Sequence, residues 1–404
     1  MKTSEEQSAS SLVDAPQGKK KVGFCLLIGG AIFMIMGGVS MYLPSLPLLE
    51  NAFHRTQGEL QFTLSIYLLF FALSQLPLGL LSDRYGRKPI FIMALSMFAL
   101  GSVITLSAEN YGLFVVGRAI QGLGAGGLST LTKTMGRDVY SGDELTQITS
   151  YLGVVVVGAP FLSLIIGAHI DQLLGWQGSF LILAGLAVTE LILVSLFLPE
   201  TFPERKRQRV SLRTLQHDIG IALHNKVFLR YAVIFAMINT IDVAYNTVGT
   251  FFYQNTLHLS SIEFAWLGVC LAVGLLMGLF ICRRIQGGRN DILGCVLFVI
   301  VSTMLLFVSF AKIESVPSLL IPMLIFSVGM GILFPYAFSK ALSAADHRVG
   351  LYSSLMGSFQ IGVSFSASWL ISLSYDGTLL SFAVIVAVCT VVITFLTLAT
   401  RLAE

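Results

Sequence analysis

Long apolar runs recur along almost the whole chain, and they decide what it can fold into. Each run is about twenty residues long, the length that an α-helix needs to cross the apolar core of a bilayer. Charged or turn-forming residues separate the runs. Twelve spans are predicted, at residues 22–44, 58–81, 89–108, 111–135, 146–170, 177–198, 227–252, 262–283, 291–311, 316–340, 349–372 and 378–400. The fold class that follows is an all-α, multi-pass membrane protein.

The composition fits this class and no soluble one. The chain of 404 residues is 55% hydrophobic and only 12% charged, about half the charged fraction of a soluble domain. The five cysteines have no C-x-x-C spacing and no accompanying histidine cluster, so neither a metal site nor a disulfide framework is expected. The sequence also has no H-E-x-x-H or G-x-S-x-G motif. We therefore expect no enzyme activity, no catalytic residues and no cofactor.

The basic residues give the orientation. Lys and Arg near membrane spans stay on the cytoplasmic side, and almost all of the 25 in this chain fall in alternate connections. On the other side only Arg55 and Lys312 occur. This asymmetry predicts a protein of the inner, cytoplasmic membrane with both termini in the cytoplasm.

The longest connection divides the spans into two sets of six. The predicted parts are a disordered cytoplasmic tail at 1–21, an N-terminal half at 22–198, a cytoplasmic linker at 199–226 and a C-terminal half at 227–404. The linker is basic, which suits a segment beside anionic lipid better than a nucleic-acid partner. Two six-span halves are typical of transporters that have a substrate site near the midplane. We expect a monomer whose partners are a small molecule, protons and the bilayer.

One turn carries far more charge than its apolar surroundings. The stretch GLLSDRYGRKP, residues 79–89, joins the second and third spans, and GLFICRRIQGGRN holds the matching place in the second half. Glycine permits a tight turn, and an aspartate can bind a neighbouring helix N-terminus. The turn is either a latch that closes and breaks or a solvated basic loop. Its candidate gating residues are Gly79, Asp83, Arg84, Gly86 and Arg87.

The same turn resembles the signature loop of the major facilitator superfamily. Three further stretches resemble the drug:proton antiporters of the Bcr/CflA type: RAIQGLGAGG from Arg118, GRDVYSGDEL at 136–145, and GVVVVGAPFLSLIIGAHI with GWQGSF after it. The third stretch adds Pro160 as a gating candidate. The resemblance implies two pseudo-symmetric six-helix halves and secondary active transport. The family usually has an acid just before Y-L-P in the first helix, where this chain has Ser40.

Three charges stand out inside predicted spans, where a charge is costly and marks a functional candidate. Asp242 shares one helix face with Asn239 and Asn246, because the three are spaced three and four apart. Asp242 is therefore either the protonatable coupling residue or a buried acid held by structural hydrogen bonds. Arg118 resembles the family's fourth-helix arginine, and Glu190 is a further coupling candidate. The candidate substrate-cavity residues are Tyr42, Asn239, Tyr245, Asn246 and Gln360.

These features predict a secondary active transporter that works by alternating access. The preferred interpretation is a proton-coupled antiporter that exports a small amphipathic molecule, such as a drug, metabolite or siderophore. The alternative keeps the fold and reverses the direction, as a proton symporter that imports a nutrient or siderophore.

Overall fold

A computed structural model describes residues 19–202, 219–285, 289–344, 349–374 and 378–401. Over these residues the long elements are all α-helices. Residues 1–18 of the predicted tail and 203–218 of the predicted linker lie outside the described residues, whereas residues 19–21, which the prediction placed in the tail, begin α2.

Twelve described helices correspond one to one with the twelve predicted spans. In the first half they are α2 (Lys19–Ser40), α4 (Gln57–Tyr85), α5 (Arg87–Leu106), α6 (Tyr111–Val139), α7 (Gly142–Leu174) and α8 (Gln177–Phe197). In the second half they are α10 (Lys226–Phe251), α11 (Ser261–Arg284), α12 (Arg289–Phe310), α13 (Val316–Ser343), α14 (Val349–Ser374) and α15 (Leu380–Arg401). The predicted fold class is confirmed.

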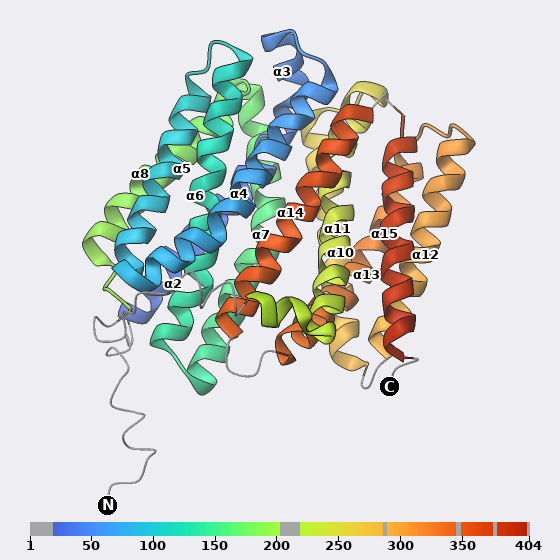
Figure 1. Ribbon diagram of the computed structural model, residues 1–404. Coiled ribbons are helices and arrows are strands. Elements are labelled where there is room, and N and C mark those ends of the chain that lie inside the picture. The colour runs from blue at the N-terminus through green and yellow to red at the C-terminus, as the bar shows by residue number, and fades with distance from the viewer. Residues whose placement is uncertain (1–18, 203–218, 286–288, 345–348, 375–377, 402–404) are drawn as a thin grey trace, which may run out of the picture.

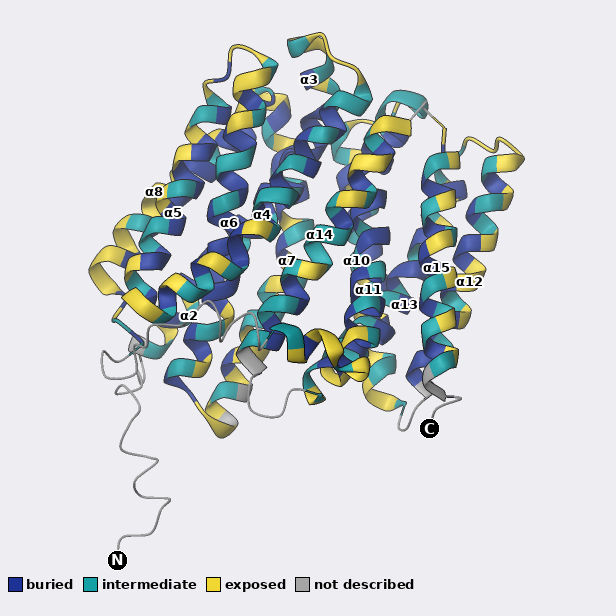
Figure 2. Cartoon of the chain, viewed as in Figure 1, coloured by how far each residue is buried: buried dark blue, intermediate teal, exposed yellow. Residues whose placement is uncertain are grey.

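The helices stand side by side in one bundle, and α2 begins at the same end at which α15 finishes (Figure 1). This end is called the terminal end below. Within the first half, α6 packs between α4 and α5; within the second, α13 packs against α11 and α12. Buried residues line the inside of the bundle, while exposed ones cover its outer helices (Figure 2).

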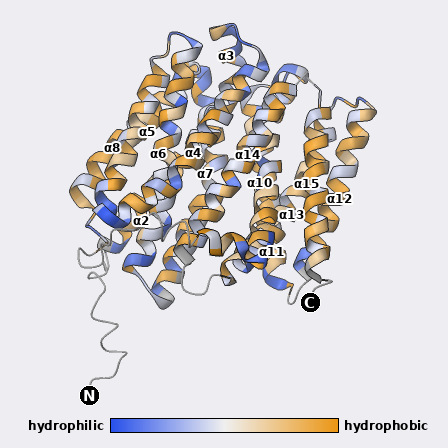
Figure 3. Cartoon of the chain, viewed as in Figure 1, coloured by the Kyte–Doolittle hydropathy of each residue, from blue (hydrophilic) through white to orange (hydrophobic). Residues whose placement is uncertain are grey.

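Helices α6 and α14 differ from the others in composition. Ten of the described helical segments are long and apolar enough to cross a membrane, and these two are not among them. Both pack against several helices: α6 against α2, α4 and α5, and α14 against α4 and α10. Because neighbouring helices replace lipid around them, they tolerate glycine and hydroxyl residues. Hydrophobic residues dominate the remaining helices in Figure 3.

The first span ends in a way that the apolar pattern did not predict. After α2, a 3₁₀ turn (η1, Leu43–Ser45) and a short helix (α3, Leu46–Phe53) follow, where a plain connection was expected. Pro44 and Pro47 stand at the starts of these two elements, positions at which the missing N–H costs nothing. The chain therefore bends and restarts instead of continuing one long helix.

Candidate functional site

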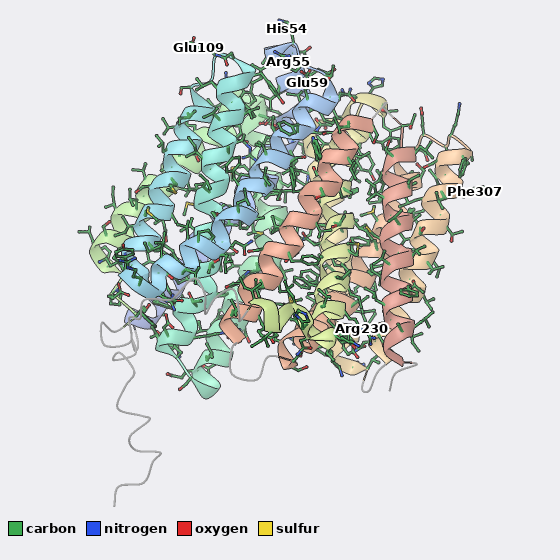
Figure 4. All side chains as sticks on the ribbon, in the orientation of Figure 1. His54, Arg55, Glu59, Glu109, Arg230 and Phe307 are labelled. Carbon is green, nitrogen blue, oxygen red and sulfur yellow. The ribbon has the colours of Figure 1, made fainter. Side chains whose placement is uncertain are left out.

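The two halves are joined by hydrogen bonds at the end opposite the termini. The amide of Asn255, in a π-helical turn after α10 (η3, Phe252–Thr256), donates to Glu50 Oε2 of α3 at 3.0 Å. Its neighbour Gln254 donates to the Pro44 carbonyl at 3.2 Å. Figure 4 places His54, Glu59 and Glu109 at this end and Arg230 towards the other. The far end of the bundle is thus closed between the halves.

Helices α4 and α14 extend this closure inwards. Ser65 Oγ of α4 donates to Ser368 Oγ of α14 at 2.8 Å, and Ser368 in turn lies 3.3 Å from Thr247 of α10. All three side chains are buried. A chain of small hydroxyls therefore bridges the first half to two helices of the second.

Helix α7 presents exposed side chains on part of its surface near the terminal end. In its outer part, Leu164 and Ala168 are buried. In its inner part, Tyr151 and Val154 are 66% and 73% exposed, and no atom lies within 4 Å of a Cβ built on Gly153. The inner part of α7 has no packed neighbour on these faces. No other described residue covers the faces of α7 that carry Tyr151 and Val154.

The predicted polar face of α10 looks into partly accessible space. Asn239, Asp242 and Asn246 are half-buried, while the apolar residues between them, Ile241 and Val243 among them, are buried. Ser364 of α14 donates to Asn239 Oδ1 at 2.9 Å. The structure thus brings the α10 face together with α14, as a shared cavity wall requires.

The other predicted cavity residues divide into two groups. Gln360 is half-buried and lies one helical turn before Ser364, so it continues the same polar wall on α14. Tyr245 and Tyr42 are buried. Tyr42 belongs to the core of the first half, where its ring packs against Phe180. In this conformation neither tyrosine forms part of an accessible wall.

Arg118 is fully buried and held by aromatic rings instead of an acid. Its guanidinium carbon lies 4.2 Å from the ring centre of Tyr42 and 4.4 Å from that of Tyr67. Nη1 donates to Gln121 at 2.5 Å, and Gln121 donates to Ser102 at 2.8 Å. Nε and Nη2 have no hydrogen-bond partner within the described chain. Cation–π contacts stabilise the charge here.

No ion pair joins Arg118 to Asp242 among the described residues, whose salt bridges involve other groups. A direct ion pair between Arg118 and Asp242 would therefore require a different conformation. Glu190 lies elsewhere again, on α8 against α2.

The charged turn between α4 and α5 is built around Arg87. Its guanidinium donates to Asp83 Oδ1 at 2.5 Å and to Asp138 Oδ2 of α6 at 2.8 Å. Glu200, just after α8, accepts from the backbone N–H groups of Arg87 and Lys88. These acids complete the N-terminus of α5, where negative charge is favourable. In this conformation Asp83 is bonded within its own half.

The remaining gating candidates are simpler. Gly86 has φ of 104°, which the turn requires and other residues rarely adopt. Gly79 faces α6, because a Cβ there would lie 3.1 Å from Thr130 Cγ2. Arg84 is exposed and stacks on Tyr85 at 5.0 Å. Pro160 lies inside the continuous helix α7.

Sequence reasoning missed two polar features. Lys133 was not among the candidates, although it lies near the end of the predicted fourth span; α6 continues to Val139 and places it well inside the helix. There it lines a small polar pocket with residues of α4, α6 and α14: Gln75, Thr130, Thr134, Arg137, Ser353 and Ser354. Asp171, just past the predicted fifth span, is buried and accepts from Ser45 Oγ at 2.5 Å. The signals available in the sequence were a lysine, Lys133, near the end of the predicted fourth span, and an aspartate, Asp171, directly after the predicted fifth span.

Comparison with known proteins agrees with this architecture. Residues 28–367 match the model of the Major Facilitator Superfamily. The chain is 24% identical to Multidrug resistance protein D of Escherichia coli K12, over 90% of this chain and 93% of that one. It is 27% identical to Multidrug resistance protein MdtL of Klebsiella pneumoniae subsp. pneumoniae, over 86% and 88%.

A solved structure shows the same fold at low sequence identity. A bacterial homologue of the human lysosomal transporter Spinster, in an inward-facing conformation, superposes with a TM-score of 0.73 at 14% identity, covering 96% of this chain and 98% of that one. The helical fold and the family match define a multi-pass membrane transporter, not an enzyme. The chain belongs to the Major Facilitator Superfamily.

Proposed function

We propose that this protein is a proton-coupled antiporter of the Bcr/CflA type that exports small amphipathic molecules across the cytoplasmic membrane. The names of its multidrug-resistance relatives support export. In the proposed orientation the terminal end, with both termini, faces the cytoplasm. Two half-bundles joined by hydrogen bonds at the end opposite the termini suit alternating access.

The observation that carries the proposal is the position of Asp242. It is an acid on a membrane helix, half-buried, between two asparagines that face the space between the halves. Within the described chain it has no ion-pair partner. A carboxyl in a partly dry cavity without a partner is costly when ionised, so it tends to hold a proton.

Exchange follows if proton and substrate compete for this acid. A substrate arriving from the cytoplasm favours the ionised carboxylate, and the proton leaves to the cytoplasm. After the halves rock, the outside proton concentration re-protonates the acid and releases the substrate. Competition prevents both from crossing together, which is the condition for antiport.

The test is transport in proteoliposomes under an imposed pH gradient, with a panel of candidate compounds. Asp242→Asn keeps the size and hydrogen bonding of the side chain but cannot titrate. It should abolish uphill accumulation driven by the gradient while binding of a neutral substrate at high pH persists. Asn239→Asp in the Asp242→Asn background is a matched control, since it returns an acid to the same face one turn away.

Uphill transport by Asp242→Asn with an unchanged pH dependence would place the coupling site elsewhere. The direction of substrate movement relative to the proton flow distinguishes the antiporter from the alternative symporter. A symporter that imports a nutrient would accumulate substrate on the side towards which protons flow, whereas the antiporter moves substrate against that flow.

A further inference from the structure

An apolar groove with one acid lies on the outside of the first half, away from the polar face of α10. It encloses about 320 Å³ between α2, α7 and α8, which is within the range of small-molecule sites. Its walls include Leu26, Phe33, Met34, Val155 and Leu186. Leu26 and Leu186 are 70% and 38% exposed, so on this side the groove opens towards lipid.

The acid in this groove is Glu190, and one of its oxygens is unsatisfied. The residue is only 8% exposed, and Oε1 is buried without a hydrogen-bond partner in the described chain. Oε2 lies against the backbone of α2, because a Cβ on Gly30 would come within 2.8 Å of it. The glycine lets the carboxyl reach the groove. A buried oxygen of this kind is costly unless a donor meets it.

The depth of Glu190 excludes a purely interfacial role. It lies two helical turns before the end of α8 at Phe197, about 10 Å from that end at 1.5 Å per residue. In the proposed orientation this is the cytoplasmic leaflet, below the level of the headgroups. A ligand must therefore bring an apolar body into the groove together with a donor that reaches Glu190.

We propose that this groove binds amphipathic amines from the cytoplasmic leaflet, with the ammonium group on Glu190 and the apolar body along α2 and α8. When the groove is empty, the unpaired carboxyl holds a proton, since an isolated charge is unfavourable at this depth. An arriving ammonium group replaces that proton with a charge-assisted hydrogen bond. The identification of this ligand as an exported molecule rests on the proposed function; the binding itself does not.

Binding can be measured with a matched fluorescent pair. Dansylcadaverine carries a protonated primary amine, and its N-acetyl derivative is the same molecule without the charge. In phosphatidylcholine nanodiscs the amine should bind wild-type protein, and Glu190→Gln should weaken this binding about tenfold or more. The acetylated probe should bind weakly and equally to both. Glu109→Gln, an exposed acid in the same half, should leave both probes unaffected.

A second measurement does not depend on affinity. A carbodiimide activates a protonated carboxyl, and a bound primary amine then displaces the urea to form an amide. Mass spectrometry should find dansylcadaverine coupled to Glu190. Coupling at Asp242 alone, or binding lost in Asp242→Asn but kept in Glu190→Gln, would overturn the proposal, because the central cavity would then be the amine site.

Lipid is the competing occupant. Phosphatidylethanolamine also carries an ammonium group, so it tests whether the bound amine is a lipid headgroup. If it abolishes the Glu190-dependent binding, the groove is a site for that lipid, and the proposal that it binds non-lipid amines fails. The same measurements also distinguish a failure of the groove proposal from a failure of the proposed antiporter function. Glu190-dependent amine binding without proton-driven export would refute the antiporter alone, whereas proton-driven export without this binding would refute the groove alone.

Discussion

Arg118 shows how a single buried charge is tolerated inside this bundle. Tyr42 and Tyr67 lie on its guanidinium, and one of its nitrogens reaches Gln121. A planar guanidinium can stack between rings, whereas a lysine ammonium is a compact point charge. The site therefore depends on shape as well as on charge.

Arg118→Lys should separate these two contributions. It should lower the free energy of unfolding by about 1–2 kcal/mol, since the stacked, desolvated guanidinium is lost. If the positive charge serves coupling, the Arg118→Lys variant should retain more pH-driven transport than the Arg118→Gln variant. Thermal unfolding in detergent and proteoliposome transport measure the two effects. Arg284→Lys, at an exposed stack on Phe280, should change neither; an unchanged stability of Arg118→Lys would contradict the stacking argument.

At the scale of elements, α7 combines a tightly packed part with a free part. Near its outer end, a Cβ on Gly167 would lie 1.8 Å from the Met41 carbonyl oxygen, so α7 and the end of α2 touch backbone to backbone. Near its inner end, a Cβ on Gly153 meets nothing within 4 Å. The outer end of α7 is thus in backbone contact with the end of α2, whereas its inner end is linked to α2 by the Lys21–Glu144 ion pair at 3.2 Å and leaves the Gly153 position free.

Gly167→Ala and Gly153→Ala make a matched pair on this helix. The first should cost about 3 kcal/mol, because a backbone contact must separate to admit the methyl group. The second should be neutral or stabilise by about 0.5–1 kcal/mol, since alanine favours a helix over glycine. Thermal unfolding of both proteins in the same detergent measures this difference. Equal stabilities would mean that α7 and the end of α2 can separate freely.

At the scale of the whole molecule, the two ends of the bundle are in different states. The end opposite the termini is closed by Asn255–Glu50 and Gln254–Pro44 hydrogen bonds between the halves. At the terminal end, Asp83 is bonded to Arg87 of its own half. The predicted latch is not formed here, and we expect Asp83 to meet a helix of the other half only in the opposite conformation.

Asp83→Asn should therefore shift the population towards the conformation described here. A cysteine at Gly153, in a variant without the five native cysteines, should react faster with an impermeant maleimide added from the terminal side. A cysteine at Gly185, which also has nothing within 4 Å but lies on the outer helix α8, should stay unreactive in both backgrounds. Unchanged Gly153 labelling together with normal transport would argue against the latch.

The sequence by itself determined the class and the order of the helices. Membrane spans need about twenty apolar residues whatever their neighbours are, and so the twelve helices could be read from local composition. The polar face of α10 was also predictable, because the spacing of Asn239, Asp242 and Asn246 follows from helix geometry alone. The charged turn was predictable as a tight turn, and Gly86 has the positive φ that it implies.

Only the tertiary structure decided which helices meet and what each charge faces. Glu190 and Asp242 look alike in sequence, as single acids within apolar helices, yet one lines a lipid-facing groove and the other faces the space between the halves. The polar neighbours of Lys133 include residues of α4 and α14, and the hydrogen-bond partner of Asp171 comes from η1; all three elements are distant in sequence from these residues. The physical reason is that lipid is as apolar as the spans themselves. Close packing and a few polar contacts between distant segments therefore set the arrangement.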